Sequence, residues 1–437
     1  MLSPIEVLQA ESRAGRRAVE RLVRRGDTVL DAKTLSRAAK IVRDVRRKGD
    51  RALLDFAQRL DGSAAESVAG LALAPLPGDA ATGADAAGLP AGFVEALERA
   101  IVAVERFHAP QARTGYRLEE EGVELEERIT PLRRVGLYVP GGRASYPSSA
   151  VMTVVPARIA GVQEIAVATP PASYLANPAL RYTLSRLGVT EIWGMGGAHA
   201  VAAFAYGTET VRRVDLIAGP GNAWVTAAKK RVAGDVAIDG LTGPSEVVIV
   251  ADPGADAGEV AADLLAQAEH DPKAVAVLIT TDAKLARRVS VEIDRQLEGL
   301  ATAETARASL ESHGAALVVA GLEEALDLVE RIAPEHLQLV GREAEVLALH
   351  VRAAGAIFIG AATPEVFGDY VAGPSHVLPT CGSARFASSL GVETFLRRSH
   401  TIRFTPVAAS HRAAAAAALA DAEGLPAHAA AARKRLG

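Results

Sequence analysis

The sequence predicts an α/β protein built from two parallel sheets with helices on their faces. Two sets of short, apolar, β-rich runs alternate with helical stretches, one set between residues 136 and 218 and the other between 246 and 360. Alternation of this length is typical of parallel sheets whose two faces are both covered. The chain has 437 residues, more than one hydrophobic core normally serves, so two or more domains are expected.

Each set contains four expected strands. They are Gly136–Val139, Glu164–Ala168, Glu191–Trp193 and Val214–Ala218 in the first set, and Glu246–Ala251, Ala274–Thr281, Ala315–Val319 and Ala356–Gly360 in the second. Alanine-rich stretches such as Ala150–Ala160 and Ala198–Ala205 are expected as helices between them.

The two ends of the chain are predicted to be helical. Pro4 is placed to begin the first helix, and the first sixty residues follow helical spacing. Residues 62–92 are rich in Gly, Ala, Pro and Ser and predict a surface excursion or linker. From Ala408 onward, the run Ala413–Ala418 favours a terminal helix, because alanine is the best helix former.

Composition excludes several classes of function. Only 23% of the residues are charged and the net charge is −4, which gives no basic face for nucleic acid. Charge or proline interrupts every long apolar stretch, and Glu6 and Glu11 fall where a signal peptide would need an apolar core. Cys381 is the only cysteine, so any metal must be held by His, carboxylate, amide or water. A cytoplasmic protein is expected.

Gln267 and His270 are the first candidate site residues. They lie three apart on a helix expected to begin near Asp256, so they project from one face, a spacing that suits two ligands of one ion. Taken alone, a histidine near a helix C-terminus is more often a surface residue that interacts with the helix dipole than a metal ligand.

Two further segments carry possible proton donors and acceptors. Ala333-Pro-Glu-His336 places Glu335 beside His336 at an expected helix start, where Glu335 could also be an ordinary first-turn acid. Gly368 to His376 is expected as a tight loop after the strand ending at Gly360. Because ligands bind at the carboxyl ends of parallel strands, Asp369 and His376 are well placed there.

Glycine-rich loops complete the pattern. Tyr138 to Gly142 and Gly219-Pro-Gly-Asn222 each follow an expected strand and precede a helix, an arrangement that turns backbone N–H groups toward phosphate. Gly194-Met-Gly-Gly-Ala-His199 comes nearest to the dinucleotide fingerprint but has histidine in place of its last glycine. The residues alone therefore indicate an α/β enzyme with a His/carboxylate site and leave nucleotide binding open.

In combination, these segments resemble the histidinol dehydrogenase family over nearly the whole chain from about residue 30. The resemblance is carried, in the family's order, by Gly136 to Gly142, Gly219-Pro-Gly-Asn222, Gly243-Pro-Ser-Glu246, Gln267-Ala-Glu-His270, Ala333-Pro-Glu-His336 and Gly368-Asp-Tyr through His376-Val-Leu-Pro379.

The resemblance implies two incomplete Rossmann-like domains, similar to those of aldehyde dehydrogenases, with small helical terminal segments. The expected division is an N-terminal arm at 1–30, a first α/β domain from 31–137 and 246–390, a second at 138–245, and a tail domain at 391–437. The tail domain of this family reaches into the neighbouring subunit, so an interlocked homodimer is expected.

The resemblance also implies a ligand set. One Zn²⁺ per subunit would be held by Gln267, His270, Asp369 and His428, the last from the tail segment Glu423 to His428. A zinc site with N and O ligands leaves positions for the imidazole and amine of L-histidinol.

The expected reaction is the oxidation of L-histidinol to L-histidine with two NAD⁺. His336 is the expected base, because imidazole titrates near neutrality, and Glu335 is expected to activate water in the second half. Substrate would contact Ser245, His376 and Glu423 besides His336 and the metal ligands, with NAD⁺ against Tyr138, His199 and Asn222.

Departures from the family pattern are few. His199 stands where the family usually has glutamine, which could change NAD⁺ affinity, and Thr242 replaces a common alanine. The alternatives are a paralogue that oxidises another small alcohol with zinc and NAD⁺, and a non-catalytic metal-binding or scaffolding protein. Metal content and NADH production distinguish all three.

Overall fold

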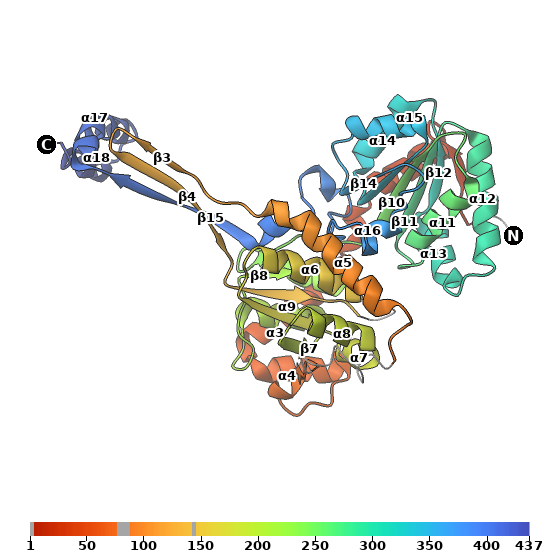
Figure 1. Cartoon of the computed structure of the whole chain (residues 1–437), viewed down its shortest axis with the longest axis horizontal. Helices are drawn as coiled ribbons and strands as arrows, with labels where there is room; N and C mark the ends of the chain where they lie inside the picture. The colour runs from red at the N-terminus through yellow and green to blue at the C-terminus, as the bar shows by residue number, and fades with distance from the viewer. Residues whose placement is uncertain (1–3, 77–87, 142–145, 437) are drawn as a thin grey trace.

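Runs of β-branched and small apolar residues form the centres of two six-stranded sheets in the computed structural model, which describes residues 4–76, 88–141 and 146–436 (Figure 1). Sheet A has the order β1 (Val7–Gln9), β12 (Ala315–Val318), β11 (Val275–Thr280), β10 (Glu246–Ala251), β13 (His336–Val340) and β14 (Ala356–Ile359). Sheet B has the order β2 (Ala72–Leu73), β7 (Glu191–Gly194), β6 (Glu164–Thr169), β5 (Arg134–Tyr138), β8 (Leu216–Ala218) and β9 (Ala237–Ile238).

Both sheets repeat one connectivity. From β10 the chain steps outward to β11 and β12 and then returns to β13 and β14 on the other side of β10. From β5 it steps in the same way to β6 and β7 and returns to β8 and β9. This is a doubly wound Rossmann order with five of its six strands, and an edge strand from the N-terminal part of the chain is added to each sheet. The expected incomplete Rossmann-like fold is confirmed.

Helices cover both faces of each sheet. Around sheet A these are α1 (Arg13–Val23), α11 (Ala257–Ala268), α12 (Ala283–Leu297), α13 (Ala303–His313), α14 (Leu322–Ile332), α15 (Arg342–Glu345) and α16 (Val366–Tyr370). Around sheet B they are α3 (Ala32–Lys48), α4 (Asp50–Asp61), α5 (Phe93–His108), α6 (Pro147–Ile159), α7 (Pro171–Ala176), α8 (Pro178–Arg186), α9 (Gly197–Tyr206) and α10 (Ala223–Val232). The short α2 (Gly26–Val29) follows α1.

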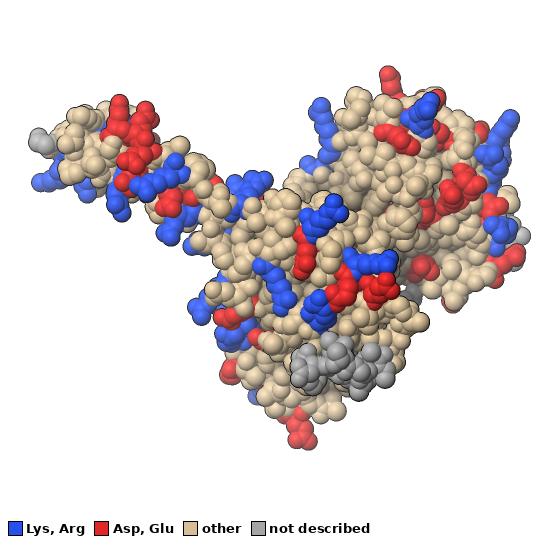
Figure 2. Space-filling model, viewed as in Figure 1, with Lys and Arg blue, Asp and Glu red and all other residues tan. Residues whose placement is uncertain are grey.

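A projecting arm carries the C-terminus away from both sheets (Figure 1). Its stem is the antiparallel sheet C, formed by β3 (Arg117–Glu120), β4 (Val123–Pro131) and β15 (Leu396–Phe404), and its tip is α17 (Pro406–Ala422) with α18 (Pro426–Arg433). We call β3, β4, β15, α17 and α18 the arm. Figure 2 shows charges of both signs interspersed on the arm and over the visible face.

The expected strands and helices of the two sheets are largely confirmed. Each of the eight expected strands is present with ends within two residues of those expected, and the helices expected at Ala150–Ala160 and Ala198–Ala205 are α6 and α9. The terminal helix expected from Ala408 is α17. Of the expected excursion at 62–92, residues 77–87 lie outside the described residues.

Three local predictions are wrong. The helix expected to begin at Pro4 is absent there, and Val7–Gln9 form the edge strand β1 because they pair in parallel with β12. The helix start expected at residues 333–336 is a strand start, because Ala333 ends α14 in the left-handed conformation (φ 48°) and His336 opens β13. Asp369, expected in a loop, lies on the short helix α16.

The expected division into domains is also wrong in one respect. Residues 31–137 were expected with 246–390, yet α3 packs on α9 and α10 and α5 packs on α6, all around sheet B. The N-terminal residues instead belong to sheet A, through β1 and through the contact of α1 with α14. The apolar stripes of α3 and α5 fit either sheet, so helical periodicity could not assign them.

Within the described ranges, no helix is both long and apolar enough to cross a lipid bilayer.

Candidate active site

A cavity of about 550 Å³ lies between the two α/β domains and collects most of the expected site residues. From sheet B it is lined by loops that follow the carboxyl ends of β5 and β8, among them Gly141 and Pro220 to Asn222. From sheet A it is lined by residues at the amino ends of β10 and β13, among them Ser245 and Glu335. Both pairs of strands flank the point where the strand order of their sheet reverses.

The rule that ligands bind at carboxyl ends therefore holds for sheet B only. In sheet A the cavity is at the opposite edge, where β10 and β13 begin. Asp369 reaches this edge because the chain after β14 turns back, and Phe358 of β14 lies against Gly368 of α16. The expected placement of Asp369 at a strand's carboxyl end is thus wrong, although its placement in the cavity is right.

The end of α11 brings two polar side chains to the cavity. Asp256 begins this helix by accepting hydrogen bonds from the backbone N–H groups of Gly258 and Glu259. Gln267 is fully buried, and neither its amide oxygen nor its amide nitrogen has a partner among the described residues. A buried amide without partners is costly, so Gln267 is arranged for a ligand.

The side chains of His270 and Asp369 lie next to each other in the lining of the cavity. The His270 Nδ1 donates to the Ala266 carbonyl oxygen at 2.9 Å, which leaves Nε2 as the free nitrogen. That Nε2 lies 3.8 Å from an Asp369 carboxylate oxygen. An imidazole whose second nitrogen is held by a carbonyl is the usual arrangement of a metal-binding histidine.

His376 is held from both ring nitrogens. Its Nδ1 donates to the Asp369 backbone oxygen at 3.0 Å, and its Nε2 lies 3.2 Å from the Ser149 hydroxyl at the start of α6. Burial lowers the pKa of the His376 imidazole, although the carboxylate of Asp369 opposes this. The neutral ring thus connects α6, which packs on sheet B, to α16 of the other domain.

Glu335 and His336 are buried side by side at the start of β13. The His336 Nδ1 donates to the Glu246 backbone oxygen at 2.9 Å and lies 3.7 Å from a Glu335 carboxylate oxygen. Its Nε2 is directed to Glu365, 3.8 Å away. The Glu335 carboxylate accepts a hydrogen bond of 2.8 Å from the Glu246 backbone N–H.

The surroundings shift the pKa values of Glu335 and His336 in directions that favour proton transfer. Burial lowers the pKa of His336, which favours a neutral imidazole able to accept a proton. Burial, together with the charges of Glu246, Asp369 and Glu365, raises the pKa of Glu335 well above its usual range. Displaced pKa values in a cleft are typical of proton-transfer groups.

Glu365 is a cavity residue that the sequence did not single out. Its carboxylate, the His336 imidazole and the Asp369 carboxylate offer ligand atoms within 4.8 Å of one another. Burial, with Asp369 and Asp263 nearby, raises its pKa well above the usual range. Glu365 lies only three residues before the Gly368 to His376 motif. The proline at 364 is the one local feature of the sequence that indicates a turn there.

A second cavity of about 1000 Å³ adjoins the first and shares Gly141, Asn222 and Trp224 with it. All three residues expected to contact NAD⁺, Tyr138, His199 and Asn222, line it. The Tyr138 hydroxyl accepts a hydrogen bond from the Gly197 N–H, and burial raises the Tyr138 pKa to about 12.

Asp61 is the residue of this second cavity that the sequence did not reveal. It ends α4, and its carboxylate accepts hydrogen bonds of 2.8 Å from both the Gly196 N–H and the His199 Nε2. The His199 ring is buried and stacks on Phe56, and its Nδ1 has no partner within the described part of the chain. Asp61 therefore fixes both the loop after β7 and the ring of His199.

Glu423 and His428 are the two expected site residues that one chain does not bring to its own cavity. Both are exposed near the tip of the arm, at the end of α17 and on α18. Neither lines the cavity between the domains.

Comparison with known proteins identifies relatives of the whole chain. The family model of histidinol dehydrogenase matches residues 24–436. A histidinol dehydrogenase from a Synechococcus species is 46% identical over 401 residues, covering 90% of each chain.

Solved structures agree with this match. The crystal structure of histidinol dehydrogenase from Elizabethkingia anophelis has a TM-score of 0.88 and 30% identity, covering 100% of this chain and 99% of its own. An acetylating aldehyde dehydrogenase from Geobacillus thermoglucosidasius is similar in fold alone, with a TM-score of 0.50 and 14% identity over 89% of this chain and 96% of its own. The resemblance to aldehyde dehydrogenases expected for the fold is confirmed.

Proposed function

Because the chain belongs to the histidinol dehydrogenase family, we propose that it oxidises L-histidinol to L-histidine through L-histidinaldehyde, using two NAD⁺. The observation that carries the proposal is the unpartnered Gln267 amide beside His270 and Asp369, in the same cavity as Glu335 and His336. An amide, an imidazole and a carboxylate next to a buried acid–base pair suit metal-assisted oxidation of an alcohol.

Zinc is the metal that this donor set favours. Gln267, His270 and Asp369 offer oxygen and nitrogen ligands, and Cys381 does not line the cavity. The ion, when bound, would polarise and orient the substrate's alcohol and amine. Glu365 and His336 also offer ligand atoms beside Asp369, so one chain supplies more possible ligands than the three named above.

His336 is proposed as the base for the substrate hydroxyl. Its Nδ1 proton is committed to the Glu246 carbonyl, so Nε2 is the nitrogen that takes a proton. Glu335 is proposed to take a proton from the water that attacks the aldehyde. The raised pKa of Glu335 brings its basicity nearer to what that task requires near neutral pH.

NAD⁺ is proposed to bind in the second cavity, where Tyr138, His199 and Asn222 lie. Asn222 caps α10, and the backbone N–H groups at this helix start favour an anionic phosphate. The nicotinamide accepts hydride when bound, and the adjoining cavities allow its ring to reach the substrate. Because the reaction draws on the intracellular NAD⁺ pool, a cytoplasmic location is part of the proposal.

The arm is proposed to complete the site of a second copy of the chain. In Figure 1 the arm projects from the body, and its tip holds the exposed Glu423 and His428. It also exposes large apolar side chains, with Leu419 68%, Val407 66% and Ile402 68% exposed. Exposed apolar surface of this kind marks an interaction site, which suits an interlocked homodimer. The partner subunit's His428 would then be the fourth zinc ligand and the partner subunit's Glu423 a contact for the substrate.

The test is the yield of NADH per L-histidinol consumed by purified protein with NAD⁺ and Zn²⁺. Two NADH per L-histidine formed, lost on chelation and restored by zinc, is expected. Binding of zinc and NAD⁺ without turnover of histidinol would refute the proposed substrate and favour another small alcohol. Absence of zinc binding would contradict the metal site itself.

A further inference from the structure

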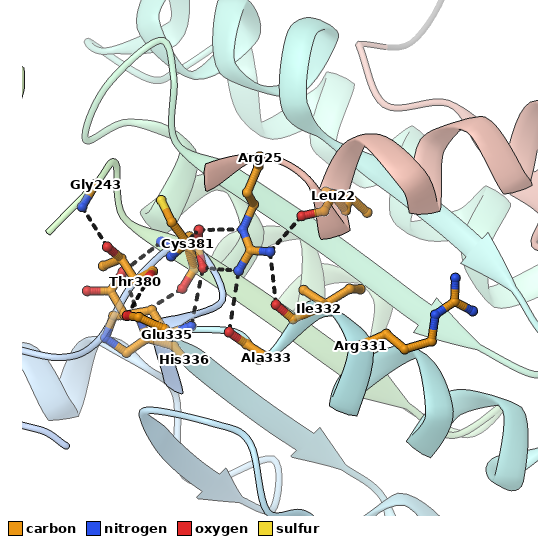
Figure 3. Close-up of polar contacts among 12 residues, drawn as sticks. Leu22, Arg25, Gly243, Arg331, Ile332, Ala333, Glu335, His336, Thr380 and Cys381 are labelled. Atoms are coloured by element: carbon orange, nitrogen blue, oxygen red, sulfur yellow. Dashed lines mark hydrogen bonds and ion pairs between the residues drawn. The ribbon is translucent and has the colours of Figure 1, made fainter. Parts of the chain in front are cut away.

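Arg25 has no role in the site proposed above, yet its guanidinium group is buried close to Glu335 (Figure 3). It donates from Nε and Nη2 to the two carboxylate oxygens of Glu246, at 2.5 and 2.6 Å. It also donates to the carbonyl oxygens of Leu22, Ile332 and Ala333. One side chain thus joins the end of α1, the end of α14 and the start of β10.

Glu246 connects this arginine to both members of the acid–base pair. Its backbone N–H donates to the Glu335 carboxylate, and its backbone oxygen accepts from the His336 Nδ1. Its side chain also accepts from the backbone N–H groups of Cys381, at 2.9 Å, and Glu335, at 3.4 Å. The position of one residue, Glu246, therefore fixes the carboxyl group of Glu335 and the tautomer of His336.

The turn that aims Glu335 at the cavity also depends on Arg25. Ala333 has a positive φ of 48°, a conformation that side chains other than glycine rarely adopt. Arg25 binds the carbonyl oxygens of Ala333 and of Ile332 before it, at 3.4 and 2.9 Å. Strained backbone persists where its surroundings determine it strongly, and here Arg25 is one of those determinants.

Stability alone gives little reason for a charged pair at this place. Apolar residues of similar volume commonly replace a buried ion pair without loss of stability, because removing two charges from water offsets their attraction. A bidentate arginine–carboxylate pair, however, defines position and orientation more tightly than apolar packing does.

We propose that Arg25 and Glu246 are positioning residues that hold Glu335 and His336 in place for catalysis. The proposal rests on the proposed oxidation of histidinol. Neither side chain lines the cavity, so neither is a contact for the substrate. Their effect reaches the reaction through the backbone of Glu246, through the turn at Ala333, and through the Glu246 carboxylate, which accepts from the Glu335 N–H.

The test compares Arg25→Lys and Glu246→Gln with a second arginine–glutamate pair remote from the cavity, in which the arginine is buried and the glutamate half-buried. Arg134 also binds Glu191 through two hydrogen bonds, from Nη1 and Nη2 at 2.8 and 2.6 Å, but at the amino end of β5, opposite to the cavity edge of sheet B. Arg134→Lys and Glu191→Gln are the controls. Each dimeric variant is assayed for zinc content and for kcat and KM with histidinol and with histidinaldehyde.

At least a tenfold fall in kcat is expected for Arg25→Lys and Glu246→Gln, with zinc content and both KM values within twofold of the unmodified protein. The controls should keep kcat within twofold. Unchanged kcat would overturn the proposal, and so would a fall matched by the controls or by loss of zinc. Failure of both variants to fold would also overturn it, because the pair would then serve the fold alone. Absence of turnover in the unmodified protein would instead refute the proposed function.

Discussion

The His336 imidazole donates through Nδ1 to the backbone oxygen of Glu246, 2.9 Å away on the neighbouring strand. β13 pairs in parallel with β10, with His336 opposite Val247, so this bond lies at the amino ends of two interior strands of sheet A. It determines which nitrogen of His336 faces the cavity, and the sheet itself thereby sets the tautomer of the proposed base.

Replacement of the base should slow both oxidations, because the alcohol and the hydrated aldehyde each give up a hydroxyl proton when hydride is removed. For His336→Ala we expect kcat to fall by a factor of about 10² to 10⁴ with histidinol and with histidinaldehyde, as is usual on loss of a general base. Steady-state NADH formation from each substrate measures this. His350→Ala, at an exposed histidine outside the cavity, is the control and should leave both rates unchanged.

Glu335→Gln should separate the two halves of the reaction. The amide keeps the shape and the acceptor for the Glu246 N–H but cannot take a proton from water. We expect at least a tenfold greater loss in the aldehyde half than in the alcohol half, measured by single-turnover NADH formation from each substrate. Equal losses in the two halves would contradict the role of Glu335 in activating water.

The same substitution should change how stability depends on pH. Below the ordinary carboxyl pKa of 4.5, Glu335 is protonated in both the folded and the unfolded chain and has no effect. Above it the unfolded chain loses the proton while the buried residue keeps it, so ionisation favours unfolding until the pH passes the raised pKa of the folded state.

Because glutamine does not ionise, the stability of Glu335→Gln relative to the parent should rise with pH above 4.5. Thermal unfolding of the zinc-free proteins at pH 5 and pH 8 measures this difference. Glu343→Gln, at an exposed carboxylate, should show no such trend. A constant difference between the two pH values would mean that Glu335 ionises normally in the folded protein.

His428 offers a test of the interlocked dimer. His428→Ala should lose zinc and activity while remaining dimeric, and His411→Ala on α17 of the same arm should lose neither. If the arm completes the partner's site, mixed dimers of inactive His428→Ala and inactive His336→Ala subunits contain one intact site.

Refolding the two variants together at equal amounts should therefore recover roughly a quarter of the parent activity, because half of the dimers are mixed and half of their sites are intact. No recovery in verified mixed dimers would mean that the arm does not act across the subunits.

Asp61→Asn should weaken the binding of NAD⁺ with little effect on kcat. The carboxylate holds both the Gly196 N–H and the His199 Nε2, and an amide cannot reproduce the charge-assisted bonds to both. We expect KM for NAD⁺ to rise about tenfold, equivalent to ~1.4 kcal/mol. Initial rates over a range of NAD⁺ concentrations measure this, with the exposed Glu66→Gln as control. A fall in kcat at unchanged KM would argue against a role in cofactor binding.

Local sequence patterns predicted the strands of both sheets well, because runs such as β10 and β11 are apolar on both faces and bounded by turns. β13 was not predicted, because its alternation of polar and apolar residues begins only at His336. The proline two residues earlier made this segment look like a helix start. The antiparallel strands β4 and β15 were missed because both are largely polar and exposed and lie far apart in the sequence.

The candidate site was predicted only where a residue lies within a recognisable motif. Gln267, His270, Asp369, Glu335 and His336 reach one cavity as expected. Arg25 and Asp61 could not be foreseen, because their partners are 221 and 138 residues away in the chain. The spacing of apolar residues predicts which face of a helix or strand is buried, but it does not predict which distant helix or strand packs against that face.

The pairing of β1 with β12 sets an order in which the domains can form during synthesis. Val7–Gln9 leave the ribosome first but find their partner only after residue 318 has been made. At about 5–20 residues per second this delay is roughly 15–60 s, during which sheet B and the helices around it can already fold. Arg25 likewise waits for Glu246, so the residues proposed to support Glu335 and His336 meet only after the last strand of sheet B has been made.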